Sequence, residues 1–178
     1  MKTSGILAVL AAFSTSVLAA PVDNAENTEI LERANLPDLN AVQSAHARSI
    51  IDEVKKVGVG MHGCEAAITT GLTEESQSSL RILANKNVPA SLNYAHDGLG
   101  SDHDSIGIFQ QRAMYYKDIA CDMKADCSAG LFFNGMKDIK GWQTMDIATL
   151  CQKVQRSAYP TAYQKYTGTA AKVCKAGM

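Results

Sequence analysis

The sequence lacks an excess of charge of either sign. Seventeen lysines and arginines stand against 18 aspartates and glutamates, so the formal net charge of the 178 residues is −1. No global field would therefore recruit nucleic acid or a membrane surface, whereas an uncharged glycan is a compatible partner. The chain also lacks internal repeats, low-complexity tracts and a second composition regime, and 46% of its residues are hydrophobic. We therefore expect one domain with its own core, acting as a monomer.

The first long apolar run is too short to cross a membrane. Lys2 precedes a hydrophobic run from Ile6 to Leu18, which ends at small residues around Ala19. This pattern is typical of a secretory signal peptide over residues 1–19, so we expect a secreted, extracellular protein. Residues 20–35 are polar and acidic, which suits either a propeptide cleaved near Glu32-Arg33 or a leader that stays attached. The folded domain is then predicted over residues 36–178.

Export makes disulfides the expected state of the cysteines, but there are five of them. Cys121 and Cys127 are close enough in sequence to close a small loop, and Cys151 with Cys174 is the next pair we predict. One thiol is left to stay free or to pair between chains. No recognisable cysteine motif supports a cysteine nucleophile.

Hydrophobic periodicity predicts a mostly helical chain. Helices are expected over residues 38–56, 62–76, 129–137, 146–156 and, from 159 or 161, to 175. Residues 76–93 are weakly helical and then loop-like. One small, glycine-punctuated β region lies in the middle, so the predicted class is α+β with two lobes around a cleft.

That central stretch, from Tyr94 to Arg112, is unusually dense in ionisable groups. His96, Asp97, Asp102, His103 and Asp104 are followed by the run Ile106–Gln111, which is predicted to be a short strand. Crowded carboxylates and imidazoles perturb one another, which favours a functional site over a structural turn. The spacing matches no zinc signature such as H-E-x-x-H, so no metal or other cofactor is expected.

A carboxylate at the end of the 62–76 helix would complement this stretch. Burial and the negative end of the helix dipole both disfavour its charge, so its pKa should rise and leave a protonated acid near neutral pH. Glu74 or Glu75 fits that role, and Asp102 or Asp104, in a wetter loop, fits an ionised partner that steers water. One of these two aspartates is expected to cap a turn instead.

Four segments carry a resemblance to a known family: LTEES…LRILAN, GSDHDSIGIFQQR, GWQ at 141–143 and VQRSAYPTAY at 154–163. They resemble a lysozyme-like hydrolase family found as secreted fungal muramidases and as bacterial and phage cell-wall hydrolases. In that family an E-S-x-L-R helix end is followed by a D-x-D-S-x-G-L-F-Q-Q-R strand. The resemblance spans roughly residues 38–174, and its second motif is the specific one.

The resemblance implies a lysozyme-type fold related to goose-type lysozymes and lytic transglycosylases. It also implies cleavage of the β-1,4 bond between N-acetylmuramic acid and N-acetylglucosamine in bacterial peptidoglycan. The sequence departs from the pattern where four residues, SQSS, separate Glu75 from Leu80. On the helix predicted over residues 62–76, Glu75 lies at the centre of the apolar face, whereas Glu74 lies at its edge. We predict Glu74 as the general acid because an acid at the edge can reach a cleft.

The remaining candidates would bind the sugar. Gln110 and Gln111 alternate along the expected strand, so one should face the substrate and the other buttress it. His103 and Tyr159 are further candidates for substrate contact, and Tyr163 is an even choice between a sugar subsite and packing. Trp142 is expected in the core rather than as a sugar platform.

Two alternatives to a hydrolase stay open: a lytic transglycosylase, which needs no second carboxylate, and a catalytically silent peptidoglycan-binding or effector protein.

Overall fold

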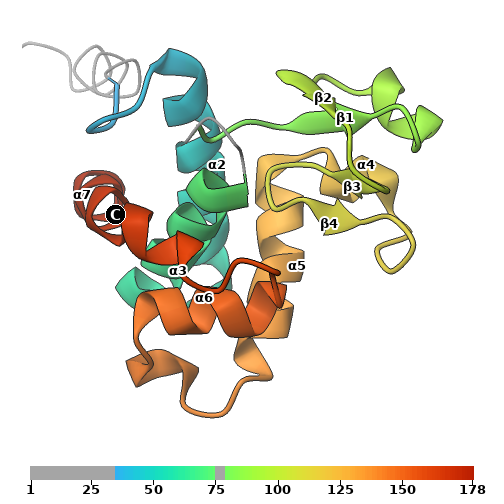
Figure 1. Ribbon diagram of the computed structural model, residues 1–178. Coiled ribbons are helices and arrows are strands. Elements are labelled where there is room, and N and C mark those ends of the chain that lie inside the picture. The colour runs from blue at the N-terminus through green and yellow to red at the C-terminus, as the bar shows by residue number, and fades with distance from the viewer. Residues whose placement is uncertain (1–34, 75–78) are drawn as a thin grey trace, which may run out of the picture. The chain divides into compact units, whose positions relative to one another are not determined.

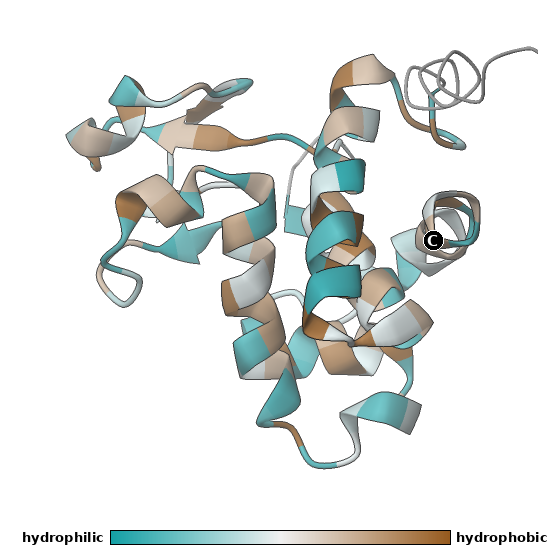
Figure 2. Cartoon of the chain, turned by 180° about the vertical axis from the view of Figure 1, so that it is seen from behind, coloured by the Kyte–Doolittle hydropathy of each residue, from teal (hydrophilic) through white to brown (hydrophobic). Residues whose placement is uncertain are grey.

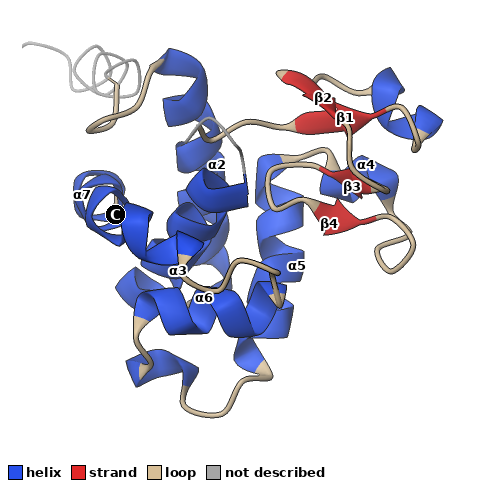
Figure 3. Ribbon diagram, in the orientation of Figure 1, coloured by secondary structure: helices blue, strands red, loops and turns tan. Residues whose placement is uncertain are grey.

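The computed structural model describes residues 35–74 and 79–178, and the unit Ala34–Met178 packs around one hydrophobic core. Its α-helices are α2 (Ala41–Val57), α3 (Gly60–Glu74), α4 (Ile119–Asp122), α5 (Ala125–Lys137), α6 (Ile147–Gln155) and α7 (Thr167–Gly177). The 3₁₀ segments are η1 (Pro89–Asn93), η2 (Trp142–Thr144) and η3 (Ala162–Tyr166). The strands are β1 (Leu83–Asn85), β2 (Gly98–Gly100), β3 (Ser105–Ile106) and β4 (Gln111–Arg112). The described residues are thus mostly helical with few strands, as the sequence predicts, and the strands form two small pairs (Figures 1 and 3).

The helix α3 lies at the centre of the helical part. It contacts α2, α6, α7 and η3, and every residue from Gly63 to Leu72 except Glu65 is buried. The residues of its predicted apolar face are buried, and Ala66, Thr69 and Thr70 on the other faces are buried as well. Neighbours on all sides therefore remove water from the helix as far as its C-terminal turn.

The helix α2 has the amphipathic character that the sequence predicts. Ile50, Ile51 and Val54 are buried, and hydrophilic and hydrophobic residues alternate along it in Figure 2. Asn40 and Gln43 form a reciprocal capping box at its start, and Gly58 ends it in the left-handed conformation. Local sequence alone therefore specifies both ends of this helix.

The strands form two pairs instead of one. Strands β1 and β2 run parallel and are joined by residues 86–97, which include η1, whereas β3 and β4 are antiparallel. A single bridge between Leu83 and Gly107 links the pairs. The expectation that residues 76–93 are weakly helical and loop-like is wrong at Leu83–Asn85, which is a strand.

The run Ile106–Gln111 is a hairpin rather than the predicted strand. Gly107 and Gln110 have positive φ angles of 74° and 48°, so the chain reverses between β3 and β4. Ile108 and Phe109 at the turn are fully buried. The apolar character that suggested a strand instead inserts the turn into the core, where Phe109 stacks on Phe132 of α5.

Two disulfides join elements of this unit. Cys121 pairs with Cys127, as predicted, whereas the predicted Cys151–Cys174 pair is wrong. Cys174 on α7 instead bonds Cys64 on α3, the helix against which α7 packs, and Cys151 is a buried free thiol.

The expected signal peptide and leader fall outside the described residues. Within residues 35–74 and 79–178, no helix has the length and apolar character needed to span a bilayer.

Candidate active site

Glu74 is the last residue of α3, and two side chains hold its carboxyl group. The Tyr163 hydroxyl of η3 donates a 2.6 Å hydrogen bond to Glu74 Oε1. The Gln155 side chain at the end of α6 also hydrogen-bonds the carboxyl group. Three elements thus fix one carboxyl group at the edge of the helical part, where it is half-buried.

The surroundings of Glu74 favour its protonated form. Desolvation is the largest cause and raises its pKa; the hydrogen bonds from Tyr163 and Gln155 lower it, and the charge of Asp102 raises it again. The net result is a raised pKa, in the direction predicted for an acid at the end of a buried helix. Such a group keeps its proton to higher pH than an ordinary glutamate does, which suits a proton donor.

Tyr163 is fully buried, which decides between the two roles considered for it. Burial and the adjacent Glu74 charge both raise the pKa of its hydroxyl, so it stays protonated and remains a donor. It therefore positions Glu74 rather than presenting a ring to a ligand. Cys151, on the neighbouring α6, is also kept protonated, because burial raises the pKa of its thiol to about 12.

Asp102 lies on the turn between β2 and β3 and is exposed. Ser105 Oγ donates to its Oδ2 at 2.7 Å, and the buried Asn85 amide donates to its backbone oxygen at 2.8 Å. Because its charge raises the pKa of Glu74, the two carboxyl groups lie within electrostatic reach of each other. The structure thus supplies a half-buried acid and a solvent-exposed carboxylate from separate parts of the unit.

Asp104, two residues later, is bonded across the β3–β4 hairpin. It accepts hydrogen bonds from Arg112 Nε and, at 2.7 Å, from the Met114 backbone. Partial desolvation opposes its charge, but these bonds and the Arg112 charge hold the pKa of Asp104 below its usual value. Asp104 is therefore the aspartate that fastens the β3–β4 hairpin, through residues eight and ten positions later rather than through the local turn capping that the sequence predicts for one of the two.

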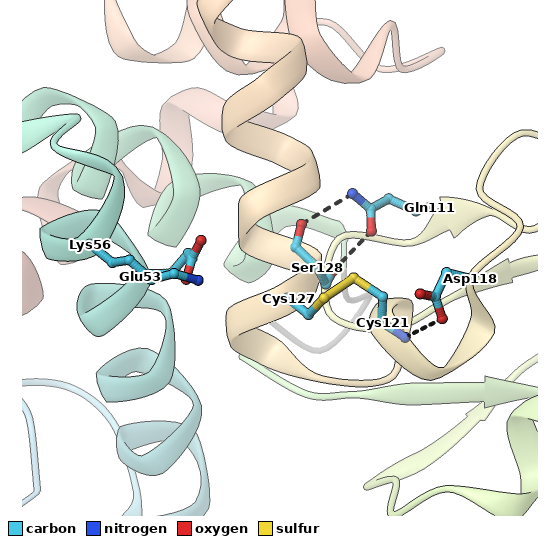
Figure 4. The surroundings of a disulfide bond; sticks show 7 residues. All are labelled: Glu53, Lys56, Gln111, Asp118, Cys121, Cys127 and Ser128. Carbon is cyan, nitrogen blue, oxygen red and sulfur yellow. Dashed lines mark hydrogen bonds and ion pairs between the residues drawn. A yellow bond between two sulfur atoms is a disulfide. The ribbon is translucent and has the colours of Figure 1, made fainter.

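Of the two glutamines at the hairpin, Gln111 takes the buttressing role that the sequence predicts for one of them. Gln111 is buried: its amide donates to the Ser128 backbone oxygen and accepts from Ser128 Oγ at 2.9 Å (Figure 4). It buttresses β4 against α5, next to the Cys121–Cys127 disulfide. Gln110 is half-exposed and donates to the Gly107 carbonyl at 2.8 Å, which leaves its oxygen available to a ligand.

The other candidates lie on the surface or pack. His103 is exposed on the same turn as Asp102, and Tyr159 is 76% exposed in the loop after α6. No hydrogen bond among the described residues joins either side chain to Glu74. Trp142 is half-buried and packs against the core, as expected. Glu75, the alternative acid, lies outside the described residues.

The rest of the charged cluster is structural. Asp97 accepts from the Ile82 backbone at 2.8 Å and pairs with His46 at 2.7 Å, while His96 contacts the Tyr94 carbonyl. Within residues 35–74 and 79–178, no three histidine, cysteine, aspartate or glutamate side chains gather as ligands for a metal ion.

Sequence reasoning missed two positioning residues. Gln155 gave no signal, because its partners Glu74 and the Phe109 carbonyl are distant in sequence. Asn85 did give one: an amide that directly follows Ile82-Leu83-Ala84 is a polar group in an apolar run. It is fully buried and hydrogen-bonds the backbone of Asp102 and Ser105, so it shapes the turn that carries Asp102.

Comparison with models of protein families gives no match for this chain, and comparison with curated proteins gives none either.

Proposed function

We propose that this protein is a secreted muramidase, a glycoside hydrolase that cleaves the β-1,4 bond between N-acetylmuramic acid and N-acetylglucosamine in bacterial peptidoglycan. The observation that carries the proposal is the state of Glu74: a carboxyl group with a raised pKa at the end of a buried helix, where the charge of the exposed Asp102 contributes to that rise. Pairs of carboxyl groups whose environments differ in this way serve glycoside hydrolysis. The motif resemblance favours peptidoglycan as the glycan.

In the proposed first step, Glu74 donates its proton to the glycosidic oxygen. The bond between C1 and that oxygen breaks, its electron pair stays on the leaving sugar, and positive charge develops at C1 and the ring oxygen. Tyr163 supports this step because its donated bond stabilises the carboxylate that remains on Glu74.

Asp102 is the proposed partner in the second half of the reaction. Its carboxylate is held in place through Ser105 and Asn85 and is open to solvent, so it can orient a water molecule and accept its proton. The water oxygen then bonds to C1, and a reducing muramic acid end results. Gln110 supplies an amide for sugar hydroxyl or acetamido groups, and His103 and Tyr159 are proposed to contact the glycan strand.

Product analysis tests the reaction type. Purified bacterial walls are digested with the protein, and the released fragments are analysed by mass spectrometry with and without borohydride reduction. The proposal predicts reducible muramic acid ends. Anhydromuramic ends would show a lytic transglycosylase, and binding to walls without release of fragments would show a non-catalytic binding protein.

A further inference from the structure

We propose that a pocket next to Glu74 binds the carboxylate-bearing substituent of muramic acid. This inference rests on the proposed function. The pocket has a volume of about 690 Å³, within the range of small-molecule sites. It lies among β4, the residues after β4, the end of α5 and the end of α6. Its polar lining includes Gln110, Arg112, Tyr116, Lys153, Gln155 and Arg156.

Gln155 connects the pocket to Glu74. Gln155 lines it and also hydrogen-bonds Glu74, so one side chain separates the pocket from the carboxyl group that would protonate the glycosidic oxygen. Gln110, the half-exposed glutamine of the hairpin, lines it too. A sugar placed for cleavage at Glu74 would therefore direct its substituents toward this pocket.

The lining has an excess of positive charge. Arg112, Lys153 and Arg156 face a single acid, Asp138. Arg112 is already paired with Asp104. The side chains of Lys153 and Arg156 are exposed and have no hydrogen bond or ion pair with any residue that the structure describes. Two cations on the last turn of one helix are thus available to an anionic ligand.

The proposed substrate carries the matching group. Muramic acid differs from N-acetylglucosamine by a lactyl ether, which ends in a carboxylate or, where it is extended, in a peptide stem with carboxylates of its own. Charge-assisted hydrogen bonds from arginine and lysine are among the stronger polar contacts, and arginine can bind a carboxylate in a bidentate manner. The pocket would thus distinguish peptidoglycan from chitin, whose sugars carry no such group.

Binding of fragments that contain no cleavable muramic acid–glucosamine bond tests this directly. Calorimetry compares three ligands: the disaccharide GlcNAc-MurNAc with its peptide stem, the same disaccharide with a bare lactyl group, and chitobiose. The test variant is Lys153→Gln/Arg156→Gln. The control is Lys86→Gln/Lys175→Gln, which removes the same charge at exposed positions outside the pocket.

We expect the test variant to bind an anionic fragment about tenfold more weakly than the wild type does, with chitobiose unaffected and the control unchanged. The difference should shrink at high salt. A loss confined to the disaccharide with the bare lactyl group identifies the lactyl carboxylate as the ligand, and a loss confined to the peptide-bearing fragment identifies a carboxylate of the stem. A loss with both shows that the pocket binds whichever carboxylate ends the substituent. Equal affinity of the test and control variants for every fragment, or no binding of any fragment by the wild type, would overturn the proposed role of the pocket.

Wild-type hydrolysis of walls is measured in parallel, so the two proposals can fail separately. Selective loss of fragment binding in a protein that releases no reducing ends would retain the pocket and reject the muramidase. Hydrolysis of walls by the wild type, together with unchanged fragment affinity in the test variant, would retain the muramidase and reject the pocket.

Discussion

Tyr163 controls the chemistry of Glu74 through one hydrogen bond. Its hydroxyl stabilises the ionised form of Glu74, so Tyr163→Phe should raise the pKa of Glu74 further. The proposed mechanism requires the protonated acid, so the alkaline limb of the pH–rate profile should move to higher pH. The conservative change also removes a buried hydrogen bond worth about 1 kcal/mol of unfolding free energy. Tyr94→Phe, at a half-buried tyrosine that ends η1, is the control; an unshifted alkaline limb in Tyr163→Phe would contradict the assignment.

Asp102 acts on Glu74 in the opposite direction. Its charge raises the pKa of Glu74, so Asp102→Asn should lower that pKa and move the alkaline limb of activity to lower pH. Turnover on walls should also fall, by about 100-fold, because the water loses its base. Asp104→Asn should instead reduce stability by about 1 kcal/mol, because it weakens the bonds to Arg112 and Met114. Wall turbidity and chemical denaturation separate the two effects. A larger loss of turnover in Asp104→Asn than in Asp102→Asn would assign the water-orienting role to Asp104.

Asp122 couples folding to pH at a position away from Glu74. It is fully buried, neither carboxyl oxygen has a partner among the described residues, and desolvation raises its pKa from 3.8 to about 7. The folded state therefore binds a proton that the unfolded state has released between these values. Its contribution to stability is full below about pH 4, declines up to pH 7 and is then gone, a change of at most about 4 kcal/mol.

Asp122→Asn should remove this decline and make the protein more stable than the wild type above pH 7. Denaturation midpoints from pH 4 to 8 measure it, with the exposed Asp52→Asn on α2 as the matched control. A variant whose stability falls with pH as steeply as that of the wild type would show that Asp122 is not the group responsible.

At the scale of elements, the β3–β4 hairpin depends on Gly107. Its φ is +74°, and a Cβ there would overlap the backbone oxygen of Asp122. Gly107→Ala should therefore cost about 3 kcal/mol or more of stability and displace the hairpin. Gly141 has a similar φ of +78° but open space around it, so Gly141→Ala should cost only about 1 kcal/mol. Equal losses in thermal denaturation would mean that the contact with Asp122 plays no part.

The elements show where sequence reasoning succeeded. The helices were predictable because their signals are local: apolar spacing, the Asn40 cap and Gly58 at the end of α2. The position of Glu74 at the end of α3 followed from the same reasoning. The hairpin was not predictable from composition, because the strand-like run Ile106–Gln111 reverses through two residues of positive φ.

The remaining features depend on contacts between distant parts of the chain. The parallel pairing of Leu83–Asn85 with Gly98–Gly100 has no local signal, since each strand has three residues. The same holds for Gln155, which meets Glu74 only after α6 packs on α3. Cysteine spacing revealed the Cys121–Cys127 loop but not the long-range pair, because any of the other three cysteines could have been the free one.

At the scale of the whole molecule, the two disulfides should differ in their effect on stability. Cys64–Cys174 joins α3 to α7 across 110 residues, whereas Cys121–Cys127 spans six. From the loop entropy of the unfolded chain, removing the first pair should cost about 5 kcal/mol and removing the second about 2 kcal/mol. Double alanine variants in urea test the order. Thiol titration of the denatured, unreduced protein should find one thiol, and three or more would contradict the assigned pairs.

The central claim is that the protein cleaves peptidoglycan and that Glu74 supplies the proton. Glu74→Gln keeps the size of the side chain but removes the acid, and Glu75→Gln is the matched neighbour. Each variant and the wild type are added to a suspension of bacterial walls, and loss of turbidity is followed while circular dichroism checks folding. We predict that the wild type and Glu75→Gln lyse the walls and that a folded Glu74→Gln does not. Lysis by Glu74→Gln together with an inactive Glu75→Gln would assign the general acid to Glu75 instead. Absence of lysis by the wild type would contradict the proposed enzyme activity.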